Sequence, residues 1–162
     1  MTERKLKTVA SSKLTLHHLM LPEHANALGN VHGGMIMRLV DEAGAICAMR
    51  HAQRPCVTIA IDSMTFQEPV HVGELLVCAA TVTWVGTSSI EVEVDVQAEN
   101  AITGSVTHTN SAFVVYIALG EDGRPAPVPG LELLTDDERK RFEEGAERQH
   151  QRLQRARARR RS

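Results

Sequence analysis

The chain has 162 residues, of which 43% are hydrophobic, and this length supports one compact domain with a buried core. Its formal net charge of -2 gives no overall attraction to nucleic acid or to an anionic membrane, so neither is expected as a partner. The three cysteines lie in apolar segments without a CxxC spacing, which favours buried free thiols in a reducing compartment over disulfides or a zinc site. Because there is no signal-peptide core and no apolar run of about 18 residues, the sequence predicts a soluble, cytoplasmic protein.

The first part of the chain predicts one strand followed by one long helix. Residues 1–12 are polar and are expected to form a flexible N-terminus. Residues 13–21 alternate as in a strand that ends at Pro22, and a loop rich in small residues carries the chain to Gly34. From Met35 to about Ala52 good helix formers continue without proline, and Pro55 marks the stop.

Four strand-like segments follow the helix, at residues 56–66, 74–85, 88–99 and 105–119. The third of them alternates strictly, so that its acidic face, with Glu91, Glu93 and Asp95, is expected to meet solvent. One helix against a largely antiparallel sheet is an α+β arrangement. Since a single helix covers only one face of a sheet, a partner subunit is expected on another side.

The end of the chain predicts an accessory helix. Three prolines and three glycines interrupt regular structure at residues 120–130, and Thr135 with Glu138 forms a capping-box pattern. The charged helix that follows has few apolar residues after Phe142, and its basic end is expected to fray into solvent. The chain therefore divides into the N-terminus at 1–12, a folded domain at 13–132, and a charged helix with a basic tail at 133–162.

Asp41 occupies an unusual position on the predicted helix. At 3.6 residues per turn it belongs neither to the apolar stripe nor to the polar face, but to a flank of small residues that another chain is expected to cover: Met37, Gly44, Ala45, Ala48 and Ala52. A partly desolvated carboxylate there would accept a proton more readily near neutral pH. The alternative is an ordinary exposed aspartate that pairs with Arg38.

The loop before this helix offers hydrogen-bond donors. Backbone N–H groups near Gly33 and Gly34 lack partners within the helix, and the helix dipole favours negative charge there, so they are candidates for an oxyanion site. Asn30 either turns the chain or holds a water molecule. His32 either takes part in catalysis or caps the helix, and glycines also begin helices for structural reasons alone.

Several segments in a shared order resemble the hotdog-fold acyl-CoA thioesterases, and most closely the cytosolic (brain-type) acyl-CoA hydrolase family. They are GNVHGGMIMRLVDEAGAICAMRH, TIAIDSMTFQEPVHVGE, GTSSIEVEV and GRPAPVP. The resemblance implies a hotdog fold at 13–132, in which a five-stranded antiparallel sheet wraps around a long central helix. It also implies homo-oligomers, commonly trimers of dimers that form a hexamer, with active sites between paired units.

The resemblance further implies hydrolysis of fatty acyl-CoA to a free fatty acid and coenzyme A, without a metal or other cofactor. Asp41 would act as general base or as nucleophile, and Asn30 of the facing subunit would orient water or the thioester. Gly34 would help to stabilise the oxyanion, with His32 as a further catalytic candidate. Contacts to coenzyme A are expected from six residues: Gly33, Arg50, Arg54, Thr58, Ser88 and Ser89.

Two other functions remain open from the sequence. A hotdog enoyl-CoA hydratase or dehydratase would use a loop histidine with a helix acid, a pair that His32 and Asp41 imitate. A non-catalytic acyl-CoA sensor is the third possibility, although no separate DNA-binding segment accompanies the domain.

Overall fold

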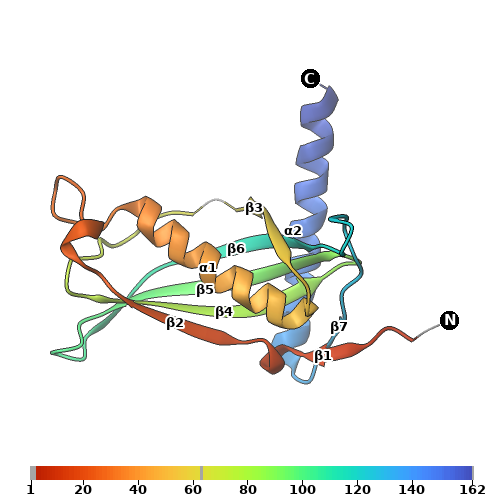
Figure 1. The fold of residues 1–162 in the computed structure, drawn as a ribbon, viewed down its shortest axis with the longest axis horizontal. Coiled ribbons are helices and arrows are strands. Elements are labelled where there is room, and N and C mark those ends of the chain that lie inside the picture. Colours follow the sequence, from red (N-terminus) through yellow and green to blue (C-terminus); the bar gives the residue numbers. More distant parts are fainter. Residues whose placement is uncertain (1–2, 63, 162) are drawn as a thin grey trace.

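The computed structural model describes residues 3–62 and 64–161, and its main feature is a five-stranded antiparallel sheet crossed by a long helix (Figure 1). The strands are β2 (Leu14–Leu19), β3 (Cys56–Ile61), β4 (Leu75–Val85), β5 (Ser89–Glu99) and β6 (Val106–Ala118). The helix is α1 (Gly33–Ala52), preceded by a 3-10 turn, η2 (Pro22–His24). This is the predicted hotdog arrangement, with α1 beginning two residues earlier than expected.

The strand order is β2-β4-β5-β6-β3, so β3 lies at one edge of the sheet although it comes second in sequence. The strands β4, β5 and β6 form a meander, which their alternating patterns and short connections favour. A register shift between Thr58 and Ala60 bends the edge strand where it pairs with β6. The described part of β3 ends at Ile61, earlier than the predicted end at residue 66, and residue 63 lies outside the described residues.

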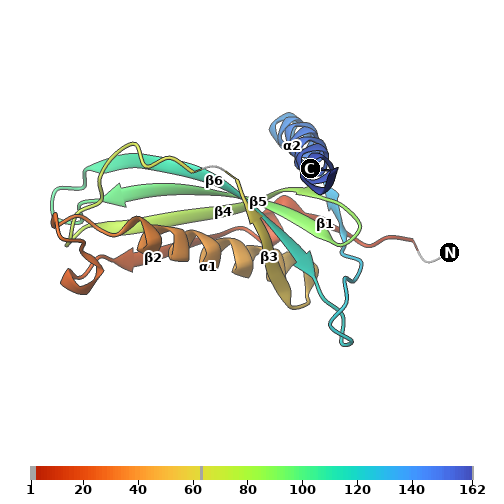
Figure 2. The same ribbon diagram turned by 90° about the horizontal axis from the view of Figure 1, so that it is seen from above.

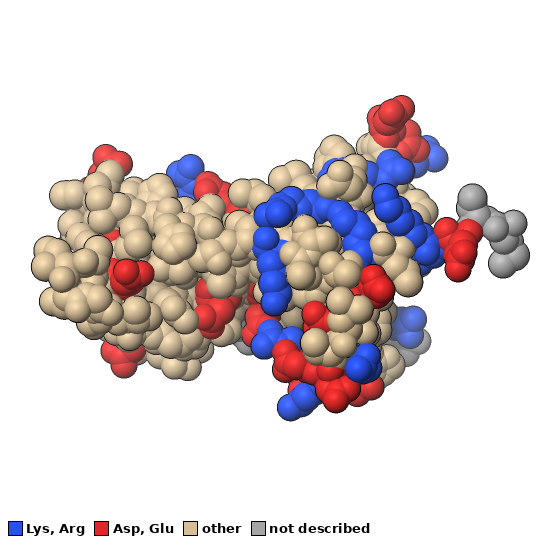
Figure 3. Space-filling model, turned by 90° about the horizontal axis from the view of Figure 1, so that it is seen from below, with Lys and Arg blue, Asp and Glu red and all other residues tan. Residues whose placement is uncertain are grey.

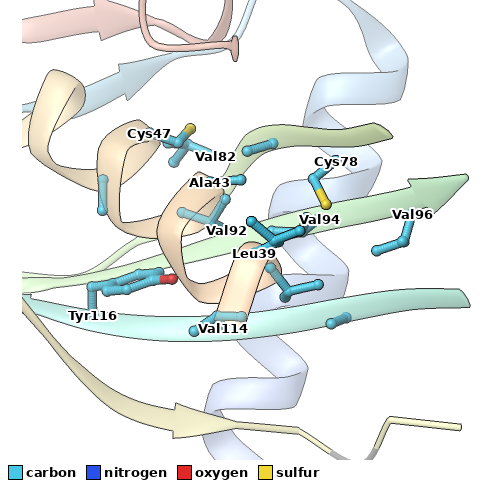
Figure 4. Packing of buried hydrophobic residues seen from close by; sticks show 14 of the residues in the cluster. Leu39, Ala43, Cys47, Cys78, Val82, Val92, Val94, Val96, Val114 and Tyr116 are labelled. Atoms are coloured by element: carbon cyan, nitrogen blue, oxygen red, sulfur yellow. The ribbon is translucent and has the colours of Figure 1, made fainter. Parts of the chain in front are cut away.

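The hydrophobic core lies between α1 and the inner face of the sheet (Figure 4). Leu39 and Ala43 point from α1 toward Val94 and Val92 of β5, Cys47 lies beside Val82 of β4, and each of these side chains is at most 1% exposed. Burying a leucine or valine side chain contributes about 1.5 to 3 kcal/mol, so this contact is a large source of stability. The apolar stripe predicted for the helix is therefore confirmed as its core face.

The C-terminal helix α2 (Asp136–Arg161) covers the opposite face of the sheet (Figure 2). The predicted capping box is confirmed, because Glu138 N–H donates to Thr135 Oγ1 at 3.1 Å and Thr135 N–H donates back to Glu138 at 3.3 Å. The expectation of a fully solvated acidic face on β5 is wrong at Glu91, whose side chain is 0% exposed. Arg148 and Arg152 of α2 bind this carboxylate on the outer face of the sheet. The alternation within one strand cannot predict such a contact, because the partners are far apart in the sequence.

Part of the N-terminus that was expected to be flexible is structured. The strand β1 (Leu6–Thr8) pairs in parallel with β7 (Gly130–Glu132), and the 3-10 turn η1 (Val9–Ser11) follows it. Val9 is 3% exposed and Ser12 is fully buried. The prediction of a flexible N-terminus was wrong because the three-residue strand β1 is stabilised by pairing with β7, which lies more than 120 positions later in the sequence. Residues 1–2 lie outside the described residues.

Two of the three thiols are buried, as the sequence predicted, and Cys56 is half-buried. Burial raises the pKa of Cys47 to about 11 and that of Cys78 to about 12, so both remain protonated and unreactive near neutral pH. In the described part of the chain, no helix is both long enough and apolar enough to cross a membrane.

Candidate active site

Asp41 lies in the middle of α1 and receives two hydroxyl hydrogen bonds from the sheet. Thr58 Oγ1 of β3 donates to Asp41 Oδ1 at 2.7 Å, and Tyr116 OH of β6 reaches the same oxygen at 3.2 Å. The Tyr116 hydroxyl also lies 3.0 Å from the backbone carbonyl of Asp41. The expected alternative of a pair with Arg38 is wrong, because Arg38 binds Glu42 at 2.9 Å.

The two hydroxyl groups leave one carboxylate oxygen of Asp41 available. Both side-chain bonds converge on Oδ1, and no hydrogen bond from residues 3–62 or 64–161 reaches Oδ2. Burial raises the pKa of Tyr116, and the neighbouring Asp41 charge raises it further, so the phenol keeps its proton and remains a donor. The arrangement fixes one oxygen and exposes the other to a reactant.

A glycine allows this contact between helix and strand. A Cβ atom at Gly44 would lie 2.3 Å from the Tyr116 hydroxyl, far inside van der Waals contact. The flank that was expected to meet another chain is thus partly wrong, since Gly44, Ala48 and Ala52 are buried within the protomer. The sheet of the same chain needs the small residues there, and Met37 remains 40% exposed.

The N-terminal turn of α1 carries free donors. Within the described residues, the N–H groups of Gly33 and Gly34 have no hydrogen-bond acceptor, whereas Met35 N–H bonds to His32 O at 3.0 Å. His32 is the N-cap residue but makes no capping bond through its side chain, so the capping alternative is wrong. A Cβ atom at Gly33 would press on Phe66, whereas nothing lies within 4 Å of one at Gly34. That position is open to an outside group.

Two asparagines shape the preceding loop. Asn26 Oδ1 accepts hydrogen bonds from the N–H groups of Leu28 at 2.9 Å and Asn30 at 3.2 Å. Both asparagines line a cleft of about 380 Å³ together with Gly33 and Phe66. The sequence pattern indicated Asn30 and not Asn26, although an asparagine shortly before a glycine is itself typical of an Asx turn.

Distance along α1 separates the helix start from Asp41. Asp41 follows Gly34 by seven positions along the helix, which corresponds to roughly 10 Å at 1.5 Å per residue. One thioester carbonyl cannot contact both groups of the same protomer. The structure therefore brings Asp41, Thr58 and Tyr116 together, but leaves Asn30, His32 and Gly34 as a separate group.

Of the six residues expected to contact coenzyme A, Gly33 lies at the start of α1, in the cleft with Asn30 and Phe66, and the other five lie toward the far end of the helix and the sheet. Ser88 and Ser89 are half-buried in the turn between β4 and β5, and Ser88 O accepts the N–H of Ala118. Arg50 donates to Lys13 O at 3.0 Å, and Arg54 is exposed beside a cleft formed with the N-terminus. Thr58 differs from the others because its hydroxyl is already committed to Asp41. No cluster of three or more His, Cys, Asp or Glu suited to a metal occurs among the described residues.

Comparison with known sequences finds a thioesterase family model and several relatives, two of which are named acyl-CoA thioester hydrolases. A sequence model described as Thioesterase superfamily matches residues 28–105. The protein VdlD of Helicobacter pylori is 35% identical over 147 residues, which cover 91% of this chain and 84% of the relative. The acyl-CoA thioester hydrolase YciA of Salmonella typhimurium is 34% identical, with 72% and 90% covered. The cytosolic acyl coenzyme A thioester hydrolase of Rattus norvegicus is 38% identical, but this chain spans only 37% of its length.

Solved structures agree with the sequence relatives. An apo-hexameric acyl-CoA thioesterase superposes with a TM-score of 0.88 at 36% identity, covering 94% of this chain and 97% of that one. An acyl-CoA hydrolase from Staphylococcus aureus, solved with butyryl coenzyme A and coenzyme A, superposes with a TM-score of 0.82 at 31% identity, covering 96% and 92%. Alanine mutants of that hydrolase have been solved at an asparagine, at an aspartate fifteen positions later, and at a threonine seventeen positions after the aspartate.

Proposed function

Because the chain belongs to the thioesterase superfamily of hotdog-fold acyl-CoA thioester hydrolases, we propose that Asp41 is the catalytic carboxylate that cleaves fatty acyl-CoA into a free fatty acid and coenzyme A. The enzyme is an acyl-CoA thioester hydrolase. The observation that carries the assignment to Asp41 is its geometry, with Oδ1 held by Thr58 and Tyr116 and Oδ2 left open.

The free oxygen suits either of two roles. As a general base, Oδ2 takes a proton from a water molecule that attacks the thioester carbonyl. As a nucleophile, it attacks the carbonyl itself and forms a mixed anhydride, which water then hydrolyses. In both cases the sulfur of coenzyme A leaves, and the donors on Oδ1 keep the carboxylate from rotating away.

The oxyanion donors are assigned to a second subunit. The unpaired N–H groups of Gly33 and Gly34 are too far from Asp41 of their own chain, but a partner could present them to the same carbonyl. The open space beside Gly34 supports this assignment. Hydrophobic side chains along α1 and the β3 edge, with Met37 40%, Met49 38% and Ile59 55% exposed, supply a surface for a second copy.

The amide partner of Asp41 is either Asn30 or Asn26. The resemblance favoured Asn30, as the loop asparagine of the motif. Asn26 precedes Asp41 by fifteen residues and Thr58 follows it by seventeen, the same spacing as the positions substituted in the Staphylococcus aureus hydrolase. This spacing favours Asn26, with Asn30 shaping the loop through its bond to Asn26. His32 remains a candidate for contact with the acyl group, since its side chain is exposed.

The assembly proposed is a hexamer built as a trimer of dimers. Three of the structural relatives are hexameric thioesterases, which supports a homo-oligomer. Coenzyme A enters as part of the substrate and requires no further cofactor. The cytosolic relatives support a cytoplasmic enzyme of the brain-type subfamily, although this chain spans only 37% of the length of the rat relative.

A thiol-release assay over acyl-CoA chain lengths tests the function with four variants. Asp41→Asn should lower kcat by about a thousandfold, within the range of lost acid-base groups. Asn26→Ala should lower it more than Asn30→Ala. Glu42→Gln, which removes a neighbouring carboxylate on the exposed face, is the matched control and should retain activity.

Subunit exchange tests whether the site is shared. Mixing Asp41→Asn with Asn26→Ala protein should restore part of the activity, because hybrid dimers contain one intact site. If the activity of the mixture never exceeds the summed activities of the two variants measured separately, the site is not shared between subunits. Hydration of crotonyl-CoA without thiol release would instead identify a hydratase, and tight coenzyme A binding without any turnover would identify a sensor.

A further inference from the structure

The helix α2 reaches the end of the edge strand β3 through charged side chains. Figure 3 shows acidic and basic side chains gathered at the end of the molecule that carries α2, while the other end of that face has few. Arg152 of α2 binds both carboxylate oxygens of Asp62, the residue after β3, at 2.8 and 3.0 Å, and it also binds Glu91 of β5. The side chains of Arg152 and Asp62 are 13% and 27% exposed and that of Glu91 is fully buried, so water screens these pairs weakly. The end of β3 is thereby tied to α2 and to the centre of the sheet.

Two further contacts extend this tie to β6, the strand that pairs with β3. Arg148, which shares Glu91 with Arg152, places its guanidinium 3.7 Å from the centre of the Phe113 ring. The backbone carbonyl of Phe113 accepts the N–H of Asp62 at 3.0 Å. Asp62 is therefore held twice, by its backbone to β6 and by its side chain to α2.

The strand β3 carries one residue more than its partner needs. Thr58 lies opposite Tyr116 of β6. Ile61, three positions after Thr58, lies opposite Val114, which is only two positions from Tyr116. The extra residue forms a bulge at Ile59. Since Tyr116 and Val114 both belong to the core beneath α1 (Figure 4), the bulge allows Thr58 and Ile61 to face α1 together.

A bulge on an edge strand needs support on both of its sides. In the part of the chain that the structure describes, β3 pairs only with β6, and this ladder is interrupted at Ile59. On one side Thr58 bonds to Asp41, and on the other side Asp62 bonds to Arg152. Release of the second tie lets the strand absorb the extra residue, and a slip of one residue turns side chains to the opposite face. A movement of only about 1 Å already breaks the 2.7 Å bond between Thr58 Oγ1 and Asp41.

We propose that Arg152 and Asp62 are positioning residues for hydrolysis, because their ion pair holds β3 in the register that presents Thr58 to Asp41. The proposal rests on the proposed function for the role of Asp41. Neither residue contacts the reacting groups, since Arg152 acts through Asp62 and Asp62 acts through Thr58. The C-terminal helix, which the sequence predicted as an accessory element, thus takes part in organising the candidate active site.

A double-mutant cycle tests this series of contacts. Asp62→Asn keeps the shape of the side chain and leaves Arg152 bound to Glu91, so the variant should fold. It should lower kcat by about tenfold and leave KM for acyl-CoA unchanged. Thr58→Val, which removes the hydroxyl group, should lower kcat by about ten- to a hundredfold. The double variant should be no less active than Thr58→Val alone, because the tie has no further effect once the hydroxyl group is absent.

Asp136→Asn is the matched control for the loss of a carboxylate beside an arginine of α2. Asp136 binds Arg139 at 3.0 Å in an exposed ion pair, and its replacement should leave kcat and KM as in the wild type. The proposal would be wrong if Asp62→Asn kept the wild-type kcat. It would also be wrong if the losses from Asp62→Asn and Thr58→Val multiplied in the double variant, as they do for independent sites.

Hydrogen exchange provides a second measurement, which needs no turnover. Backbone amides of residues 56–61 should exchange about tenfold faster in Asp62→Asn than in the wild type, while those of β5 should keep their rates. Wild-type exchange rates along β3 in Asp62→Asn would overturn the proposal even in an active enzyme. Faster exchange along β3 in a protein that hydrolyses no thioester would support the tie between α2 and β3 and refute only the hydrolase function.

Discussion

On the inner face of the sheet, α1 is held by side chains without charge, whereas on the outer face α2 is held by arginines that reach three carboxylates, those of Glu91, Glu93 and Asp62. Arg148 binds Glu91 through two nitrogens at 2.8 and 3.1 Å, and its guanidinium lies 3.7 Å from the centre of the Phe113 ring. Arg152 binds Glu91 and forms a two-pronged bond with Asp62 at 2.8 and 3.0 Å. Burial alone would lower the pKa of Arg152, but these bonds and charges raise it overall.

The two faces of the sheet differ in how their stability responds to substitutions. Apolar packing on the inner face loses stability gradually as volume is removed. A buried ion pair depends on every member, because removing one partner leaves an uncompensated charge out of water. Gly145 adds a steric requirement to α2, since a Cβ atom there would lie 2.6 Å from Trp84. The inner face thus supplies stability, and the outer face fixes the position of α2.

The largest expected effect is at Glu91. Glu91→Ala should lower the free energy of unfolding by about 3 to 5 kcal/mol, because Arg148 and Arg152 lose their shared buried partner. Urea denaturation measures this loss, and faster trypsin cleavage within α2 should accompany it. A loss below about 1 kcal/mol would mean that α2 does not depend on the ion pairs. A second variant that replaces Glu91 and Arg148 together by leucine and methionine should recover much of the loss.

A smaller effect is expected on the inner face at Gly44. Gly44→Ala should destabilise the fold by about 1 to 3 kcal/mol, because the added methyl group overlaps the Tyr116 hydroxyl. The same shift should lower kcat, since Tyr116 would no longer reach Asp41 Oδ1. Tyr116→Phe is the matched variant, as it removes the hydroxyl and makes room. If Gly44→Ala kept full activity, the Tyr116 contact would not be needed for catalysis.

The smallest effect comes from His51, near the end of α1. Burial lowers the pKa of His51, whose Nε2 lies 2.9 Å from Pro129 O, while its Nδ1 has no partner in the described part of the chain. A lowered folded-state pKa means that the unfolded chain binds the proton first. The contribution of neutral His51 to the free energy of unfolding is therefore fully present above about pH 6.5, and it is lost as the pH decreases from there.

Thermodynamic measurement can isolate this proton. Between about pH 6.5 and 5, the unfolding free energy of the wild type should fall more steeply than that of His51→Gln, by up to about 1.4 kcal/mol per pH unit. Urea denaturation at several pH values measures both slopes. Equal slopes would show that His51 takes up no proton on unfolding in this range.

Local sequence patterns predicted much of the fold. Three features depend only on neighbours a few residues away, and the sequence therefore predicted them. They are the alternation in β4, β5 and β6, the apolar stripe of α1 and the capping box at Thr135. The position of Asp41 beside that stripe likewise followed from helical periodicity. Its hydroxyl partners did not, because Thr58 and Tyr116 lie on other strands and only sheet pairing brings them to Asp41.

The sequence by itself determined the elements, the helix face that enters the core and the aspartate on its flank. The tertiary structure alone decided that Glu91 is buried, that β1 pairs with β7 and that Arg152 of α2 reaches Asp62 at the end of β3. The physical reason is the range of the interactions. Periodic burial is encoded within a few residues, whereas ion pairs and sheet edges join positions that only the folded chain brings together.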